Sequence, residues 1–405
     1  MDSNNKEALF TIASKNYISF VRTVLNSVKK HNGGIDLYFL LADESDGYFD
    51  KTQENFRVVE ARELRIQNYK QMTFRYNIIE FNTSLKPFFI EYLLDKGYEK
   101  IIYLDPDIMV FDKLQFIYEL LDKYSLILTP HITRPILENE VCYTPDNMFL
   151  LAGTFNLGFI AISDNIETRE LVKWWMRKCT FESIIDPYYS GCFVDQKWCT
   201  LFPGFLNNIF TLRHPGCNMS IWNLHERELS DKLVNGDFSL IFYHFSGFDP
   251  SNNNCLSKNQ DVFTFETRPD LKNIFMEYTK SIFKYGYSTT NKWPYKYATF
   301  HNGVHITQIA RQLFPNVEKL FSDPFSIEND SYYSLLLNKK LITLNKSENM
   351  SDTSSPQKHS IDRYTSLLTF FLKLCLKLFG PYRYAKLLDF TRKAIDIRKQ
   401  DYLLK

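Results

Sequence analysis

The sequence predicts an α/β fold, in which a doubly wound, mainly parallel sheet carries helices on both faces and a C-terminal helical region follows. Three observations lead to this prediction. Short apolar runs alternate with segments of helical periodicity between residues 7 and 248. Two of these runs flank the acidic segment Asp105-Pro106-Asp107. Beyond about residue 255 the alternation gives way to irregular helical segments. Strands that alternate with helices are typical of parallel sheets.

The first strand, helix and strand are expected within residues 7–43. The run EALFTIA (7–13) is short and apolar, as a buried strand is. Gly33 and Gly34 end the helix that follows, and IDLYFLLAD (35–43) predicts the second strand. The helix is indicated by apolar residues at helical spacing, which are Ile18, Val21, Val24, Leu25 and Val28.

Four further segments continue the alternation. A helix is expected at 85–94, closed by Asp95-Lys96-Gly97. KIIYLDPDIMVF (100–111) predicts two strand-like runs around the acidic segment. FNLGFIAI (155–162) predicts a strand before a helix at 167–178, and LIFYHFSGF (240–248) predicts the last strand.

The chain is expected to contain four parts. Residues 1–260 form the α/β domain that carries the motifs described below, and residues 261–345 form a helical accessory region. The segment 346–362 is rich in Ser, Asn and Asp and is expected to be a flexible linker. Residues 363–405 form a basic amphipathic helical tail, broken at Gly380-Pro381.

Composition and charge exclude several classes of protein. The chain is 44% hydrophobic and 23% charged, which excludes a mostly disordered chain, and its net charge of +1 excludes a nucleic-acid-binding polycation. Residues 358–405, however, hold 11 Lys and Arg against four Asp and Glu. This basic tail is expected to bind an anionic surface. The first residues do not have the pattern of a secretory signal, so none is expected. No apolar run reaches about 18 residues, so no membrane-spanning helix is expected. The seven cysteines form no CxxC pair and are expected to be reduced.

Asp105 and Asp107 are the strongest local sign of chemistry. Two carboxylates at i and i+2, placed where a parallel strand stops, can face the cleft in which open α/β sheets bind ligands. Hard oxygen ligands of this kind suit Mg²⁺ or Mn²⁺ bound to a diphosphate. The same pattern also caps ordinary turns, so that interpretation stays open.

Six segments in order resemble bacterial glycosyltransferases of the GT-A fold. The similarity is to the retaining, metal-dependent family related to glycogenin and the lipopolysaccharide galactosyltransferases (family 8), over residues 7–260. It implies a hexosyltransferase that moves a sugar from a nucleotide diphosphate to an acceptor hydroxyl. The segments are LKPFF, GYEKIIYLDPDIMVF, TFNLGFIAI, FVDQKW, NMSIWNLHER and YHFSGFDP.

The resemblance also implies the site residues. Asp105, Asp107 and His244 would hold Mn²⁺ (or Mg²⁺), although His244 taken alone would be interpreted as a core histidine. Asp195 and Gln196 would be the catalytic residues beside the donor sugar. The residues implied in binding the nucleotide or donor are Ala13, Asn16, Tyr17, Lys86, Asp105, Asn156, Gly247 and Lys258.

Simpler interpretations of these residues remain open. Asn156 suits a turn before Gly158, Asp195 suits a helix N-cap, and Lys86 suits a solvated surface lysine. One departure from the family concerns the end of the first strand, where Ser14 and Lys15 replace two acidic residues, one of which reads uracil. Tyr17 could still stack on a base, and UDP remains the expected nucleotide.

A few other residues are assigned from the sequence with less detail. Trp174, Trp175 and Trp222 are expected to be packing residues rather than platforms for a sugar. The segment 223–227 (NLHER) is expected to line the acceptor side or to form a solvated turn. Asp43 and Glu44 are expected either to serve the nucleotide or to end the second strand.

The expected function is Mn²⁺-dependent, retaining sugar transfer from a UDP-sugar in the synthesis of a bacterial surface polysaccharide, O-antigen or capsule. The expected partners are the donor, a glycan or lipid-linked acceptor and, through the tail, the inner face of the cytoplasmic membrane, with no nucleic acid. Two alternatives are a non-catalytic sugar-nucleotide or glycan binding protein of the same fold and a protein-glycosylating transferase. A metal-dependent phosphohydrolase would need further carboxylates beside Asp105 and Asp107.

Overall fold

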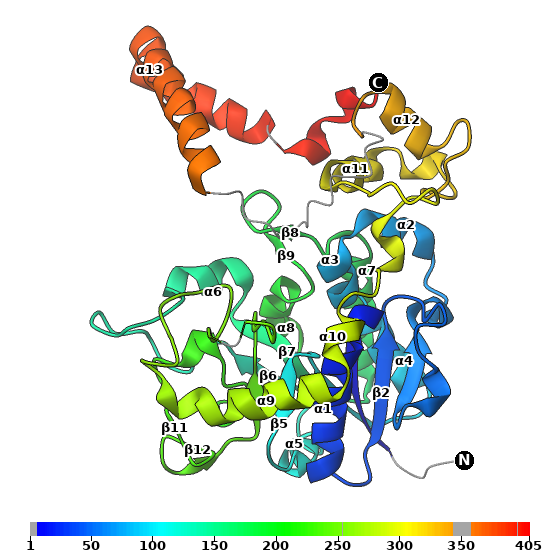
Figure 1. Ribbon diagram of the computed structural model, residues 1–405, viewed down its shortest axis with the longest axis vertical. Coiled ribbons are helices and arrows are strands. Elements are labelled where there is room, and N and C mark those ends of the chain that lie inside the picture. Colours follow the sequence, from blue (N-terminus) through cyan, green and yellow to red (C-terminus); the bar gives the residue numbers. More distant parts are fainter. Residues whose placement is uncertain (1–5, 253, 343–357, 395) are drawn as a thin grey trace. The chain divides into compact units, whose positions relative to one another are not determined.

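The computed structural model describes residues 6–252, 254–342, 358–394 and 396–405, with the backbone alone for 358–367 and 392–394. The chain divides into two compact units (Figure 1). The first contains the chain up to Met72 and Ile78–Lys296, and the second contains Thr73–Asn77 and Tyr297–Lys405.

A seven-stranded sheet forms the centre of the first unit, in the order β10-β6-β7-β4-β1-β2-β3. Strand β7 is antiparallel to its neighbours β4 and β6, and the other neighbouring pairs are parallel. The strands are β1 (Glu7–Ala13), β2 (Asp36–Leu41), β3 (Arg57–Glu60), β4 (Lys100–Leu104), β6 (Leu126–Pro130), β7 (Phe155–Ser163) and β10 (Ile209–Thr211). Its helices are α1 (Ile18–His31), α3 (Ile78–Ser84), α4 (Lys86–Asp95), α5 (Gln115–Leu120), α6 (Asp146–Ala152), α7 (Ile166–Phe181), α8 (Phe202–Phe205), α9 (Lys272–Lys284) and α10 (Tyr287–Thr290), while α2 (Tyr69–Arg75) crosses into the second unit.

Helices cover both faces of this sheet because side chains alternate across each strand. On one face, Leu9, Phe39 and Ile102 share an apolar core with α1 and α5. On the other face, the ring of Phe10 lies 5.1 Å from the ring of Phe89 in α4, and α4 packs on α7. The predicted α/β fold with a mainly parallel sheet is therefore confirmed, and β7 makes the sheet mixed.

Three small sheets extend the first unit. The pair β5 (Ile108–Val110) and β14 (Phe242–His244) is antiparallel, with His244 opposite Ile108. This pairing joins the segment after β4 to a strand near residue 240. The other two sheets are β8 (Ile185–Asp186) with β9 (Cys192–Phe193), and β11 (Leu229–Ser230), β12 (Leu233–Val234) and β13 (Phe238–Ser239).

The second unit is built around Phe74 and Arg311. The ring of Phe74 contacts those of Phe300, Phe314, Phe325 and Tyr332. The buried Arg311 guanidinium donates to the carbonyls of Phe74, Tyr76 and Tyr297 at 2.6–2.7 Å, which satisfies its charge with backbone dipoles. Its α-helices are α11 (Gln308–Leu313), α12 (Tyr332–Asn338) and α13 (Lys358–Ala394).

Helix α13 bends at Gly380, which has a φ of 70° and precedes Pro381. Of the expected linker at 346–362, residues 346–357 lie outside the described part of the chain, and α13 begins at Lys358. After α13, the Arg398 carbonyl accepts a 3.0 Å hydrogen bond from Asn316, so the last residues pack on the rest of the second unit. Among the described residues, no helix is both long enough and apolar enough to span a bilayer.

Candidate active site

The acidic segment forms the turn between β4 and β5. The Asp105 N–H donates to the Gly158 carbonyl of β7 at 2.8 Å, and the Ile108 N–H donates to the Asp105 carbonyl at 3.2 Å. The Phe245 N–H donates to the Asp107 carbonyl at 2.9 Å, immediately after β14. Backbone hydrogen bonds to β7 and to the end of β14 therefore hold both carboxylates in place.

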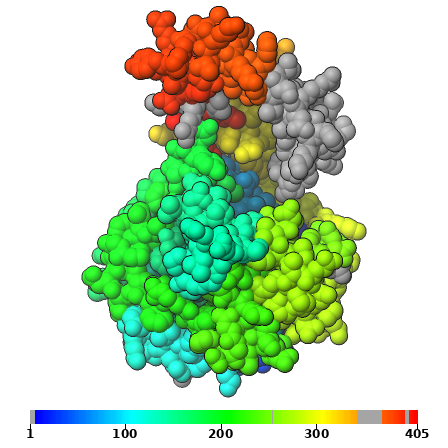
Figure 2. Space-filling view, turned by 90° about the vertical axis from the view of Figure 1, so that its left-hand side faces the viewer, coloured from blue at the N-terminus to red at the C-terminus, as the bar shows by residue number. Residues whose placement is uncertain are grey.

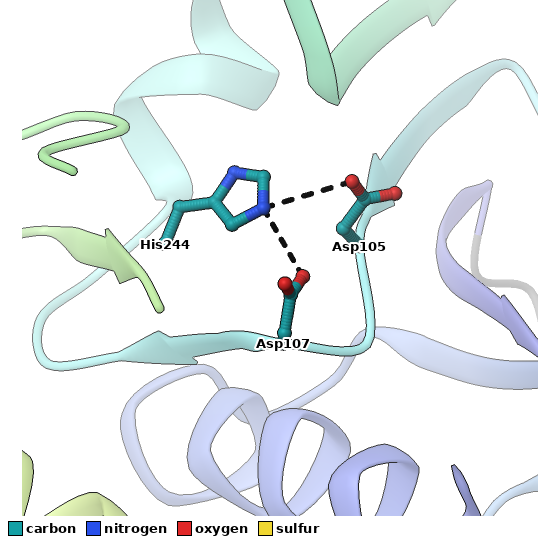
Figure 3. Close-up of side chains that lie close together, drawn as sticks. All are labelled: Asp105, Asp107 and His244. Atoms are coloured by element: carbon teal, nitrogen blue, oxygen red, sulfur yellow. Dashed lines mark ion pairs between the residues drawn. The ribbon is translucent and has the colours of Figure 1, made fainter. Parts of the chain in front are cut away.

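His244 lies against the two carboxylates, as Figure 3 shows. Its Nε2 is 3.1 Å from Asp107 Oδ1 and 3.8 Å from Asp105 Oδ2. Ligand atoms of the three side chains all lie within 4.8 Å of one another. The structure thus brings together the three residues that the sequence predicted as metal ligands.

Gly158 makes room for His244. A Cβ at this position would lie 2.4 Å from Cε1 and 2.6 Å from Nδ1 of the His244 ring. Real side chains do not approach this closely, because the overlap is strongly repulsive. The glycine of the FNLGF segment is therefore required by the ring packed against β7.

The charges of His244 and Asp105 depend on their neighbours. Burial by itself lowers the pKa of His244, but the Asp107 and Asp105 carboxylates outweigh burial and raise it. Burial raises the pKa of Asp105, against the opposing effects of Lys86 and His244. A divalent cation would satisfy both carboxylates and take the Nε2 lone pair in place of a proton. Two carboxylates with one imidazole suit Mn²⁺, and the Asp side chains, 27% and 24% exposed, leave a side open for phosphate or water. The residues therefore fit such an ion.

Lys86 and Asp195 form a buried ion pair next to this centre. Lys86 Nζ lies 2.7 Å from Asp195 Oδ2, donates to the Leu157 carbonyl at 2.8 Å and sits 4.3 Å from the centroid of the Tyr103 ring. The Tyr103 hydroxyl in turn donates to Asp105 Oδ1 at 2.5 Å. Lys86 is therefore not a solvated surface lysine, and it links Asp195 to the acidic turn.

Gln196 and Asn156 are held by β7 and α6. The Gln196 side-chain oxygen accepts the Leu157 N–H at 3.0 Å, and its amide nitrogen donates to the Ala152 carbonyl at 3.0 Å. Asn156 Oδ1 accepts the Gly158 N–H at 3.0 Å. Val194 precedes Asp195 with a φ of 45°, which is strained for a β-branched residue. Such strain is common where a loop holds functional side chains.

The residues expected to hold the nucleotide follow β1. Ala13 ends this strand, and the Ser14 hydroxyl donates to Asn16 Oδ1 at 2.7 Å. The Tyr17 ring stacks on Phe20 with centroids 4.6 Å apart. Burial raises the pKa of Tyr17 to about 12, and the charge of Asp107 adds to the shift. Tyr17 is nevertheless 41% exposed, so part of its ring is open to solvent.

Lys15 is paired inside the protein. Its Nζ lies 3.0 Å from Asp43 Oδ2, and the two side chains are 1% and 0% exposed. Asp43 also accepts the Lys296 N–H at 3.1 Å. Asp43 was expected either to serve the nucleotide or to end the second strand. These contacts support the structural role at the end of β2.

Gly247 and Lys258 lie on one tight loop. Gly247 has a φ of 70°, and a Cβ there would lie 2.5 Å from the Ser257 hydroxyl. Its carbonyl accepts the Lys258 N–H at 2.9 Å. The Lys258 side chain is exposed, and its role toward phosphate stays a prediction.

Three residues beside His244 were not predicted to have a role at the site. Asn218 Oδ1 lies 3.3 Å from His244 Nδ1. The Trp222 ring meets His244 edge-on at 5.1 Å and His131 at 5.5 Å. The sequence placed Asn218 and Trp222 in a recognised segment, but nothing in it pointed to His131. In the NLHER segment, the Glu226 carboxylate accepts the Thr133 N–H at 3.0 Å and so braces a neighbouring loop.

Comparisons with known proteins find a family model and relatives that match part of this chain. The family model described as "Glycosyl transferase family 8" matches residues 8–172. The uncharacterized protein YfnD of Bacillus subtilis (strain 168) is 24% identical over 282 residues, covering 66% of this chain and 86% of YfnD. The uncharacterized protein YfnF of the same organism is 30% identical over 176 residues, which cover 42% of this chain and 57% of YfnF.

Solved structures similar to this chain include two glycosyltransferases. The galactosyltransferase LgtC, in complex with donor and acceptor sugar analogs, is 17% identical, with 68% of this chain and 95% of LgtC covered and a TM-score of 0.40. The glycosyltransferase GlyE of Streptococcus pneumoniae TIGR4 is 17% identical, with 73% of this chain and 67% of GlyE covered and a TM-score of 0.39.

Proposed function

We propose that this glycosyltransferase, which matches the model of glycosyl transferase family 8 over residues 8–172, transfers a sugar from a UDP-sugar to an acceptor hydroxyl in a Mn²⁺-dependent reaction. The observation that carries this proposal is the convergence of Asp105, Asp107 and His244 from two separate segments. A two-carboxylate, one-imidazole set beside a buried Lys-Asp pair is suited to a charged, hydroxyl-rich donor.

The residues around the metal ligands have separate tasks in this proposal. A Mn²⁺ ion held by Asp105, Asp107 and His244 would supply Lewis-acid stabilisation of the departing diphosphate. Asp195 accepts hydrogen bonds from donor hydroxyls, and Lys86 keeps its carboxylate ionised. Asn156, next to the Leu157 N–H that binds Gln196, also contacts the donor sugar in this proposal. The Gln196 amide lies between β7 and α6, where its dipole can stabilise positive charge that develops on the sugar.

The donor subsite follows from the segment after β1. Tyr17 stacks against the base, and Ala13 and Asn16 line the end of the strand. Gly247 and Lys258 contact the diphosphate, the former through its backbone. UDP is proposed although Ser14 and Lys15 replace the family's acids, because Lys15 is neutralised by Asp43 and adds no net charge to the subsite.

The stereochemistry, acceptor and location complete the proposal. The reaction retains the anomeric configuration, since the chain resembles a retaining family. The acceptor is a glycan, most simply one linked to a lipid during synthesis of a surface polysaccharide, and the enzyme works at the inner face of the cytoplasmic membrane. The support for this location is α13, which exposes Leu368, Phe370, Phe371, Leu378, Phe379 and Tyr382.

The test is hydrolysis of a panel of UDP-sugars with Mn²⁺ and no acceptor. Wild-type protein should release UDP slowly from one sugar, and EDTA should stop the release. Asp107→Asn should lose at least nine-tenths of the rate while its circular dichroism is unchanged. Asp231→Asn, at an exposed turn, is the matched control and should behave as wild type. UDP-sugar binding with no hydrolysis and no transfer would favour the non-catalytic alternative instead.

A further inference from the structure

A chain of hydrogen bonds starts at the face of His244 that points away from the carboxylates. His244 Nδ1 lies 3.3 Å from Asn218 Oδ1. Asn218 Nδ2 donates to Asn156 Oδ1 at 3.0 Å and to the Thr129 hydroxyl at 2.8 Å. Asn156 Nδ2 lies 3.4 Å from His131 Nε2, and His131 Nδ1 lies 3.2 Å from the Thr154 carbonyl.

Two backbone groups determine the direction of every bond in this chain. The Gly158 N–H can only donate, and it donates to Asn156 Oδ1 at 3.0 Å. The orientation of the Asn156 amide is therefore set, and Asn156 Nδ2 is a donor to His131 Nε2. The Thr154 carbonyl can only accept, so the hydrogen of neutral His131 is on Nδ1. Both ends require the same orientation of Asn156.

The orientation of Asn156 sets the tautomer of His244. Asn156 Oδ1 accepts, so the group of Asn218 that faces it must be the amide nitrogen. The Asn218 oxygen then faces His244 Nδ1, and an amide oxygen can only accept. His244 Nδ1 must therefore carry a hydrogen, which leaves Nε2 as the ligand atom, 3.1 Å from Asp107 Oδ1.

This series of hydrogen bonds is rigid, because its side chains are buried and the backbone of Asn218 is constrained. Asn218, Asn156, His131 and His244 are each at most 7% exposed. Asn218 has a φ of 55°, a left-handed conformation that asparagine and glycine tolerate best. Burial lowers the pKa of His131 to about 4, so its ring is neutral at physiological pH and Nε2 remains an acceptor.

We propose that Asn218 is a positioning residue of the metal centre, which holds His244 with Nδ1 protonated and Nε2 directed at the ion, and that Asn156 and His131 fix the Asn218 amide. This inference rests on the proposed function, because it assigns a role toward the Mn²⁺ of that reaction. Partners that orient a metal-binding histidine typically change metal affinity by about 10–100-fold when removed.

The test measures free Mn²⁺ by electron paramagnetic resonance in the presence of UDP, on the full chain. Asn218→Gly removes the amide without backbone strain, since glycine accepts the left-handed conformation. We expect its Mn²⁺ dissociation constant to rise about 10–100-fold. Asn218→Asp keeps an oxygen acceptor for His244 but loses the donor to Asn156 Oδ1, so its Mn²⁺ dissociation constant should rise less than that of Asn218→Gly.

A double-mutant cycle separates positioning from general damage. In a His244→Ala background, Asn218→Gly should change Mn²⁺ affinity by less than about twofold, because the interaction has already been removed. Equal losses in both backgrounds, or no loss with His244 present, would overturn the proposal. Equal losses in Asn218→Gly and Asn218→Asp would also overturn it. If Asn218→Gly does not fold, Asn218→Ser replaces it, since its hydroxyl is too short to reach His244.

The same measurements distinguish failure of the positioning role from failure of the proposed function. If wild-type protein binds no Mn²⁺ with UDP, both the function and the positioning role are wrong. If wild-type protein binds Mn²⁺ and hydrolyses a UDP-sugar while Asn218→Gly binds the ion equally well, only the positioning role is wrong.

Discussion

The Lys86 ammonium lies 2.7 Å from the Asp195 carboxylate, and both side chains are almost completely buried. Lys86 begins α4, and Asp195 lies in the loop after β9. Burial by itself lowers the pKa of Lys86, but the charges of Asp195 and Asp105 outweigh burial and raise it. Burial also raises the pKa of Asp195, against the opposing charge of Lys86, so each charge is stabilised chiefly by the other across the 2.7 Å contact.

Removal of one member of this pair should destabilise the protein more than removal of both. Lys86→Met leaves the Asp195 carboxylate buried without its partner, which should lower the free energy of unfolding by about 3–5 kcal/mol. Lys86→Met combined with Asp195→Leu replaces the pair by apolar side chains and should recover most of that loss. Urea unfolding measures both. The double variant should still lack UDP-sugar hydrolysis, and a double variant as unstable as the single one would contradict this account.

The fold and the acidic turn could be predicted because their signals are local. Periodicity within short segments indicated β1, β4 and β7, and the carboxylates of Asp105 and Asp107 are near neighbours in the sequence. His244 was assigned only through the resemblance, because pairing of β14 with β5 joins distant segments. No local sequence pattern indicates which two strands will pair with each other.

The environment of the site could not be predicted from the sequence, for a similar reason. Lys86 could be interpreted as a surface or a donor-site residue, and only its contact with Asp195 decided that it is buried. Asn218 and His131 act through hydrogen bonds whose direction depends on backbone groups of β7 and on Thr154. Such directions follow from tertiary packing, which periodicity and spacing do not describe.

Substitution of Gly158 should damage the metal centre from the side of β7. In Gly158→Ala, the methyl group would lie 2.4 Å from His244 Cε1, so the ring must move. Displacement of a catalytic group by about 1 Å can reduce activity about 100-fold, and we expect Mn²⁺-dependent hydrolysis to fall by that order. Gly204→Ala in α8 is the control, because nothing lies within 4 Å of its Cβ position. Wild-type activity in Gly158→Ala would show that His244 is not held where the structure places it.

His131 should make the stability of the protein depend on pH. Its pKa is about 4 in the folded protein against 6.5 as a free side chain. The unfolded chain therefore binds the proton more readily, and stability present above pH 6.5 is lost as the pH falls toward 4. Between pH 7.5 and pH 5 this loss is about 2 kcal/mol.

The measurement is the free energy of unfolding at both pH values, without metal, for wild-type protein and His131→Phe. The phenylalanine cannot take up a proton, so the change with pH should be smaller by about 2 kcal/mol in the variant. Other titrating groups are common to both proteins and cancel in the comparison. An identical change with pH in the two proteins would mean that His131 is protonated equally well when folded.

The last prediction concerns the exposed apolar side chains of α13. Phe370, Phe371 and Leu378 are 69%, 58% and 67% exposed. Lys373 and Lys377 lie between them in the sequence, and Arg383 and Lys386 follow. Each apolar side chain that enters a bilayer interface contributes about 1.5–3 kcal/mol, and each basic side chain near an anionic leaflet contributes about 1 kcal/mol. We therefore expect the protein to co-sediment with anionic liposomes, and less with neutral ones or at high salt.

Substitution tests this better than truncation, because residues beyond α13 pack on the second unit through Asn316. Phe370→Ser with Phe371→Ser should lower liposome binding by about 100-fold or more, as the loss of two buried rings requires. UDP-sugar hydrolysis in solution should be unchanged. Leu320→Ser, at a residue that is 75% exposed outside α13, is the control. If the double variant binds liposomes as wild type does, α13 is not the anchor. If instead wild-type protein ignores liposomes but self-associates, and the double variant is monomeric, these rings form an interface between two copies of the chain.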